Sequence, residues 1–150
     1  MTTHPEHILE TQLIEQLVTI GYAQVSIPNE GALLRNLKSQ LEKHNGITFT
    51  AKEFERVLNI LSKGSGFEKA KTLREKQHLV RDNGDNLYFE FLNTQHWCRN
   101  QYQVTNQVAM EGSCKNRYDV TLLINGLPLV QIELKRRGLE MKEAFNQVNR

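Results

Sequence analysis

The sequence contains no apolar run near the ~18 residues that a helix needs to cross a bilayer. Its opening segment, Met1 to Glu10, also lacks the basic and then apolar pattern of a secretory signal. No G-x-x-x-x-G-K-[ST] loop is present, so this chain is not expected to hydrolyse ATP. These absences exclude a membrane span and an ATP-driven motor, and they favour a cytoplasmic protein.

Cysteine is scarce, and Cys98 and Cys114 are isolated thiols without C-x-x-C spacing. We expect both to be reduced, as is usual in the cytosol, and neither has an evident histidine partner for nucleophilic catalysis. The histidines are scattered, and only His4 and His7 stand at a spacing that could suit zinc. Zinc binding and thiol chemistry are therefore not indicated.

Neither positive nor negative residues are in large excess, and the net charge is only +2. This value neither requires nor excludes nucleic acid as a partner. The 39% of hydrophobic and 24% of charged residues are ordinary proportions, and 150 residues can bury a core. With no internal repeat and no long linker, residues 1–150 are expected to form a single domain.

Apolar residues recur at helical spacing in the first half of the chain, and strand patterns follow in the second. Thr50 and Glu53 form a capping-box pattern at the start of one helix. Helices are expected over 6–20, 30–44, from 50 to about 62, 67–75 and 139–150, and strands over 77–81, 87–92 and 101–109, followed by a hairpin. The expected fold class is α/β (α+β), with a helical N-terminal half followed by a mixed, mainly antiparallel sheet flanked by helices.

The most informative segment is the predicted hairpin from 117 to 135. Aliphatic residues alternate with polar ones along both strands, as Val120, Leu122 and Ile124 in the first and Val130, Ile132 and Leu134 in the second. Asp119 falls on the polar face of the first strand, and Glu133 and Lys135 fall on that of the second. Each strand is therefore expected to have one buried face.

The loop of this hairpin decides whether these charged residues meet. A two-residue Asn125-Gly126 turn would pair residues whose numbers have an odd sum, and the two aliphatic faces would then lie on opposite sides. Leaving an aliphatic side chain in water costs about 1.5–3 kcal/mol. We therefore expect an odd loop, Ile124-Asn125-Gly126, with Gly126 in the left-handed region and with Asp119, Glu133 and Lys135 on one face.

Two carboxylates and a lysine at the edge of one sheet suit metal-dependent phosphodiester hydrolysis. Asp119 and Glu133 could hold Mg²⁺, with the carbonyl group of Leu134 as a third protein ligand. Lys135 is a compact cation that could orient the attacking water or hold a phosphate oxygen. The D-x₁₃-E-x-K spacing is a weak pattern by itself, however, and a surface ion pair between strand ends remains the alternative.

Basic and aromatic residues near this segment are compatible with nucleic acid. The basic residues that lie around it in the sequence are Arg99, Lys115, Arg117, Lys135, Arg136 and Arg137. They could form a rim that meets a phosphate backbone, or each could simply belong to a solvated surface. Trp97 could stack on a base, but a partly buried structural tryptophan is favoured.

The segments 116–121 and 130–136, with the Asn125-Gly126-Leu127-Pro128 turn between them, resemble the nuclease motif of the restriction (R, or HsdR) subunit of type I restriction enzymes. That motif belongs to the PD-(D/E)xK nuclease superfamily, so the resemblance implies a restriction-endonuclease-like core. It extends over nearly the whole chain, including the opening helix that ends at Gly21-Tyr22. The superfamily's proline is replaced here by Tyr118, at a position that is known to be loose.

The resemblance implies roles for further residues and partners. Asp119 and Glu133 would be the Mg²⁺ ligands and Lys135 the catalytic lysine. Glu10 matches an acidic residue of the first helix, although it could be an ordinary surface glutamate, and Gln147 matches the glutamine of a Q-x-x-x-Y motif. The tyrosine of that motif would lie beyond Arg150, and no stop signal ends the last helix, so we expect the chain to be cut from a longer protein.

The sequence therefore predicts an Mg²⁺-dependent DNA endonuclease domain of a type I restriction subunit. The resemblance implies DNA, the modification methylase and the specificity subunit as partners, with no membrane, and it confines ATP to the longer subunit. The main alternative is a non-catalytic module that keeps the nuclease fold for docking DNA or a partner subunit. A phosphodiesterase that acts on RNA or a small phosphate ester is a third and weaker possibility.

Overall fold

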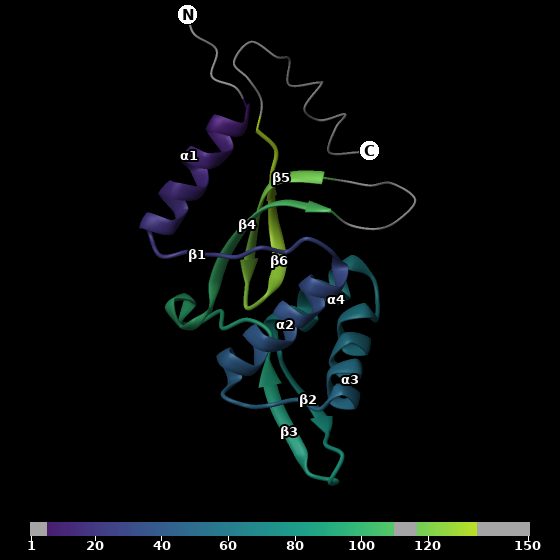
Figure 1. Cartoon of the computed structure of the whole chain (residues 1–150). Helices are drawn as coiled ribbons and strands as arrows, with labels where there is room; N and C mark the ends of the chain where they lie inside the picture. The colour runs from purple at the N-terminus through teal and green to yellow at the C-terminus, as the bar shows by residue number, and fades with distance from the viewer. Residues whose placement is uncertain (1–5, 110–116, 135–150) are drawn as a thin grey trace, which may run out of the picture.

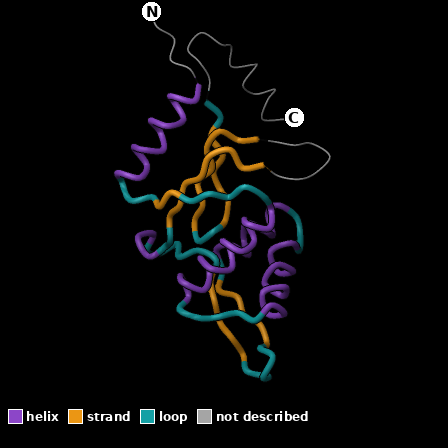
Figure 2. Tube along the Cα trace, viewed as in Figure 1, coloured by secondary structure: helices purple, strands orange, loops and turns teal. Residues whose placement is uncertain are grey.

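A computed structural model describes residues 6–109 and 117–134, and within these ranges it gives the backbone alone for 107–109 and 117–119. The predicted final helix, 139–150, lies outside the described residues. The helical first half and the sheet-rich second half are confirmed (Figure 1, Figure 2). In chain order the elements are α1 (Glu6–Thr19), β1 (Ala23–Gln24), α2 (Glu30–Asn45), α3 (Ala51–Ser62), α4 (Gly66–Arg74), β2 (Lys76–Val80), β3 (Asn86–Glu90), the 3₁₀ helix η1 (Trp97–Arg99), β4 (Tyr102–Ala109), β5 (Arg117–Ile124) and β6 (Leu127–Ile132).

The helix boundaries follow from local capping chemistry. The Asn29 side chain accepts a hydrogen bond from the Ala32 amide at the start of α2, and Gly46 ends that helix in the left-handed region with φ 66°. The predicted capping box of α3 is confirmed, because the side chains of Thr50 and Glu53 each accept a hydrogen bond from the backbone N–H of the other. These contacts satisfy amides that the first turn of a helix leaves unpaired.

Glu53 also joins α3 to the turn between β2 and β3. Its side chain is 2% exposed, and its carboxylate accepts hydrogen bonds from Arg81 Nε at 3.2 Å and from the Asp82 amide at 3.4 Å. The Arg81 hydrogen bond, and after it the bond from the Thr50 amide, lowers the pKa of Glu53 below its ordinary 4.5 against the opposing effect of burial. The cap is therefore a tertiary contact as well as a local one.

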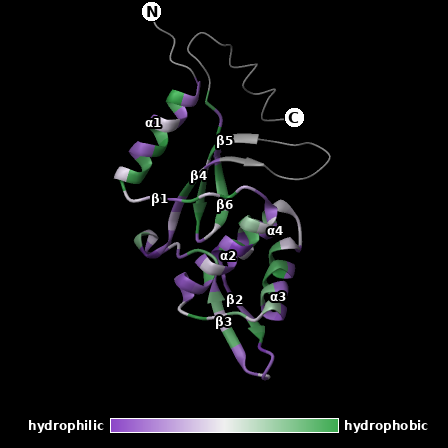
Figure 3. Cartoon of the chain, in the orientation of Figure 1, coloured by the Kyte–Doolittle hydropathy of each residue, from purple (hydrophilic) through white to green (hydrophobic). Residues whose placement is uncertain are grey.

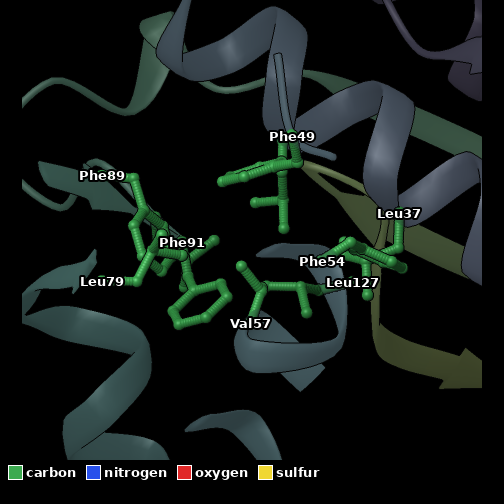
Figure 4. Packing of buried hydrophobic residues seen from close by; sticks show 10 residues of the cluster. Leu37, Phe49, Phe54, Val57, Leu79, Phe89, Phe91 and Leu127 are labelled. Atoms are coloured by element: carbon green, nitrogen blue, oxygen red, sulfur yellow. The ribbon is translucent and has the colours of Figure 1, made fainter. Parts of the chain in front are cut away.

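The largest apolar cluster lies between α2, α3 and the β2–β3 hairpin (Figure 4). Phe49 and Phe89 meet edge to face with ring centroids 5.8 Å apart, and Phe89 meets Phe91 in the same way at 5.3 Å. Leu41 and Val57 are fully buried beside them. Hydrophilic residues gather instead at the tip of the hairpin (Figure 3). The cluster thus fixes the two-stranded sheet against the helices.

The four-stranded sheet has the order β1-β4-β5-β6, with β1 parallel to β4 and the other neighbours antiparallel. One face is covered by α1, where Ile14 packs with Val104 and Val120. The other face meets the start of α2, where Leu33 packs with Leu123. The mixed, mainly antiparallel sheet flanked by helices is therefore confirmed. In the part of the chain that is described, no helix combines the length and the apolar character of a membrane span.

Candidate active site

The turn of the β5–β6 hairpin differs from the prediction. Asn125 and Gly126 both have positive φ, 51° and 83°, and Ile124 pairs directly with Leu127. The loop is therefore the two-residue type that the Asn-Gly pair favours, and the predicted three-residue loop is wrong. The left-handed conformation predicted for Gly126 is confirmed.

A β-bulge, rather than the loop, sets the register beyond the turn. Leu123 pairs with Pro128, but the next pair is Leu122 with Val130, so Leu129 is an extra residue on β6. Further along, Val120 pairs with Ile132, which is the even-sum register that the aliphatic pattern predicted. The predicted register is therefore correct, but a bulge on β6 produces it and not the predicted three-residue loop.

This register carries the predicted acidic residues to neighbouring positions. Asp119 directly precedes Val120 in β5, and Glu133 directly follows Ile132, the partner of Val120. Glu133 is partly buried and has further interactions of its own. The side chain of Asp119 lies outside the described set, as do Lys135 and Gln147 altogether. The meeting of the two carboxylates therefore stays a prediction that rests on the backbone register.

The expectation that each strand has one buried face is wrong for β5, which is buried on both faces. Val120 and Thr121 are adjacent and point to opposite faces, yet they are 0% and 1% exposed. The reason is that β5 is an inner strand with a helix over each face. On β6 the aliphatic Val130 is 41% exposed. Alternation of aliphatic and polar residues therefore did not mark the solvent side of these strands.

Glu10 lies on α1 and is buried, with 7% of its surface exposed. Its Oε1 accepts a hydrogen bond from Asn106 Nδ2 at 3.0 Å, and Asn106 pairs with Val120 across the sheet. Glu10 is therefore not an ordinary surface glutamate, because it ties α1 to β4 one residue from the Asp119 position on β5. Its role in catalysis stays a prediction.

The Asn125 side chain is a structural feature that sequence reasoning missed. Its amide nitrogen donates to the Phe91 carbonyl at 2.8 Å and to Asn100 Oδ1 at 2.9 Å, and its oxygen accepts from the Gln101 amide. Asn125 is fully buried, so these bonds fix the closed end of the hairpin to the segment between β3 and β4. The Asn-Gly pair signalled a turn in the sequence but gave no sign of this network.

Arg99 does not belong to a basic rim around Asp119. It lies in η1, just before β4, and β4 starts opposite Ile124 at the closed end of the hairpin. Because β4 and β5 are antiparallel, Asp119 lies five residues away along β5, about 17 Å at 3.4 Å per residue. Trp97, also in η1, is 49% exposed. The other basic residues of the proposed rim have side chains outside the described set.

Among the described side chains, no group of three or more His, Cys, Asp or Glu residues could hold a metal ion. The Asp119 carboxylate is not among them, so the predicted Mg²⁺ site stays a prediction. Glu133 and the Leu134 carbonyl group are the predicted ligands that the structure does describe, at the end of β6.

Comparison with known proteins identifies the family. Residues 5–150 match the family described as the type I restriction enzyme R protein N terminus. A type I restriction enzyme endonuclease subunit of Staphylococcus saprophyticus is 52% identical over 100% of the chain, and one of Staphylococcus aureus is 48% identical over the same share. The EcoprrI endonuclease subunit of Escherichia coli is 41% identical over 95% of the chain.

The chain spans 17% of the length of the two staphylococcal relatives and 47% of that of the Escherichia coli relative. The match covers the hairpin, its Asn-Gly turn and the helices that flank the sheet. The chain therefore belongs to the family formed by the N-terminal region of type I restriction enzyme R proteins.

Proposed function

We propose that this chain is the nuclease domain of a type I restriction enzyme R subunit and hydrolyses DNA phosphodiester bonds with Mg²⁺, as a member of the PD-(D/E)xK superfamily. The observation that carries the proposal is the register of β5 and β6, in which Val120 opposite Ile132 makes Asp119 and Glu133 neighbours. The names of the relatives as endonuclease subunits support it.

The predicted ligands on β5 and after β6 are oxygen atoms, and Mg²⁺ prefers a few hard oxygen ligands. The carboxylates of Asp119 and Glu133 and the carbonyl group of Leu134 would hold the ion. When bound, Mg²⁺ would neutralise charge on the phosphate and lower the pKa of a coordinated water.

The remaining residues would position the reacting groups. Lys135 follows the ligands and would hold the attacking water or a non-bridging phosphate oxygen through its ammonium group. Glu10 would act by positioning β4 beside the acidic pair, through its hydrogen bond to Asn106. Gln147 would support the site from the segment that follows.

The partners of the whole protein are part of the same proposal. Within a type I enzyme the R subunit would act with the modification methylase and with the specificity subunit, which would supply sequence recognition. The ATP-driven motor would belong to the remainder of the longer subunit. DNA would therefore be delivered to this domain rather than selected by it.

Plasmid nicking in Mg²⁺ by the full-length protein tests the proposal. Lys135→Ala is expected to lower the nicking rate by about 100-fold or more, the usual effect of removing one group that stabilises developing charge. Lys52→Ala, which removes an exposed lysine on α3, is expected to leave the rate unchanged. Equal nicking by the wild type and Lys135→Ala would contradict the assignment.

Measuring DNA retention as well as nicking separates the alternatives. A non-catalytic docking module would retain DNA in a salt-sensitive manner, without dependence on Mg²⁺ or on Asp119. Substituting Asp119→Ala and omitting Mg²⁺ would then change nothing. Faster cleavage of an RNA substrate than of DNA would favour the RNA alternative.

A further inference from the structure

A polar cavity lies at the closed end of the β5–β6 hairpin. Its volume is about 550 Å³, and it is lined by the end of α2, the end of α4, the base of the β2–β3 hairpin and the segment between β3 and β4. That segment is bonded to the turn of β5–β6 through the Asn125 amide. The cavity is therefore separate from the proposed catalytic edge, which is at the opposite end of β5.

Three cationic side chains line this cavity: Arg74, Lys76 and Arg99. In the described part of the protein, no carboxylate lies within 4 Å of their charged nitrogens. Lys76 stands opposite Glu90 in the β2–β3 register, but Glu90 Oε1 lies 3.0 Å from His44 Nε2 instead. The wall thus presents three cations against one carboxylate, and that carboxylate already has a partner.

Hydrogen bonds from the end of α2 hold two of the cavity walls, the segment that carries Arg99 and the base of the β2–β3 hairpin. The His44 side chain is 3% exposed, and its Nδ1 lies 3.2 Å from the carbonyl oxygen of Arg99. The side chain of Asn45 bonds both the N–H and the carbonyl group of Glu90. Because these two walls are fixed to α2, the backbone of Arg99 and of the hairpin base needs little reordering when a ligand binds.

An exposed aromatic ring stands at the same wall. Tyr88 is 69% exposed and lines the cavity from β3, with its ring 5.9 Å from that of His78 on β2. A flat ring beside unpaired cations is a combination that single-stranded nucleic-acid sites use, since the cations meet phosphates and the ring stacks on an unpaired base. A site for an acidic peptide would not need the ring.

We propose that this cavity binds a backbone phosphate of DNA through Arg74, Lys76 and Arg99, with Tyr88 against the neighbouring nucleotide. Guanidinium groups offer several N–H donors to phosphate oxygens, and the unpaired state of these cations in the free protein leaves those donors available. The inference rests on DNA as the substrate in the proposed function. It adds an anchoring point on DNA that flanks the scissile phosphate.

DNA binding in EDTA tests this anchoring point without cleavage, by fluorescence anisotropy of a labelled duplex with a single-stranded end, whose unpaired bases can stack on Tyr88. The triple variant Arg74→Gln, Lys76→Gln, Arg99→Gln is expected to bind at least tenfold more weakly. The slope of log affinity against log salt concentration should become shallower by roughly 0.9 for each phosphate that the variant no longer neutralises. Tyr88→Ala should weaken binding about fivefold or more, and Tyr88→Phe should restore most of that affinity.

The matched control removes the same charge from exposed positions on or next to α3 and α4 that do not line the cavity: Lys52→Gln, Lys63→Gln, Lys69→Gln. Thermal melting of each variant confirms that it is folded. Equal weakening by the control triple, or wild-type affinity in the cavity triple, would overturn the proposal. Loss of binding to the purified methylase or specificity subunit, with DNA affinity intact, would also overturn it and identify a protein-docking surface.

The outcomes for the cavity and for the active site are distinguishable. Asp119→Ala should abolish nicking but leave DNA affinity in EDTA unchanged. If the cavity triple binds normally while wild-type protein still nicks DNA in Mg²⁺, the cavity proposal fails and the proposed function stands. If wild-type protein binds DNA through the cavity but never nicks it in Mg²⁺, the proposed function fails and the cavity proposal stands.

Discussion

Single residues in this protein can determine the local backbone conformation and also make a tertiary contact. Gly126 is left-handed with φ 83°, and a Cβ atom added there would lie 2.6 Å from the Cα atom of Leu37 on α2. The sequence predicted the left-handed conformation of Gly126 from turn chemistry alone. The approach to α2 could not be predicted, because nothing in the sequence shows which helix passes the turn.

A comparison of Gly126 with Gly84 separates the energetic effect of the close approach to α2 from that of the left-handed backbone. Gly84 has nearly the same φ, 90°, but a Cβ atom there would have nothing within 4 Å. Gly84→Ala should cost only the left-handed strain, about 1–2 kcal/mol, and Gly126→Ala should cost about 2–5 kcal/mol because overpacking adds to that strain. Urea unfolding measures both variants. Equal destabilisation by the two substitutions would show that α2 yields to the added methyl group.

Glu53 gives a pH-dependent prediction at the same scale. Because the folded protein lowers the pKa of Glu53 below 4.5, the ionised group stabilises the fold above that pH, and the contribution is lost as pH falls through the lowered pKa. Glu53→Gln should therefore lower the urea midpoint at neutral pH, and the gap from wild type should shrink below about pH 4.5. A gap that stays constant down to pH 3 would refute this view of the Arg81–Glu53 pair.

At the scale of elements, local signals predicted the structure well where a motif is self-contained. The capping box at Thr50 and the hairpin register were predicted and are confirmed. The loop was predicted wrongly because the aliphatic pattern of the hairpin was assumed to need an odd loop. An Asn-Gly turn followed by a bulge at Leu129 satisfies both the turn preference and the pattern.

Engineered cysteine pairs test the register that the bulge creates, in a background where Cys98 and Cys114 are replaced by serine. Val120 and Ile132 are direct partners on one face, close enough for a disulfide, so Val120→Cys with Ile132→Cys should cross-link on mild oxidation. Val120→Cys with Gln131→Cys should stay reduced, because neighbouring residues of β6 point to opposite faces. Non-reducing electrophoresis of the unfolded proteins measures both. Cross-linking of the second pair instead of the first would mean that the hairpin has no bulge and that Asp119 and Glu133 lie on opposite faces.

At the scale of the whole molecule, the sequence predicted the class of fold but not the meeting of distant segments. The cavity draws on Asn45, Arg74 and Arg99, which stand far apart in the chain and share no motif. The parallel pairing of β1 with β4 likewise extends the sheet with a two-residue strand that no periodicity revealed. The acidic pair, which stays a prediction, could be proposed from the sequence because both of its members belong to one hairpin, whose register the aliphatic pattern predicted.

The central claim is that Asp119 and Glu133 form one metal site, and calorimetric titration of the protein with Mn²⁺ tests it most directly. The account predicts that wild type binds Mn²⁺ and that Asp119→Asn and Glu133→Gln each lower the affinity at least tenfold. Glu55→Gln, which removes the same charge from an exposed position on α3, should bind like wild type. Equal Mn²⁺ affinity in all four proteins, or no binding by wild type, would contradict the claim.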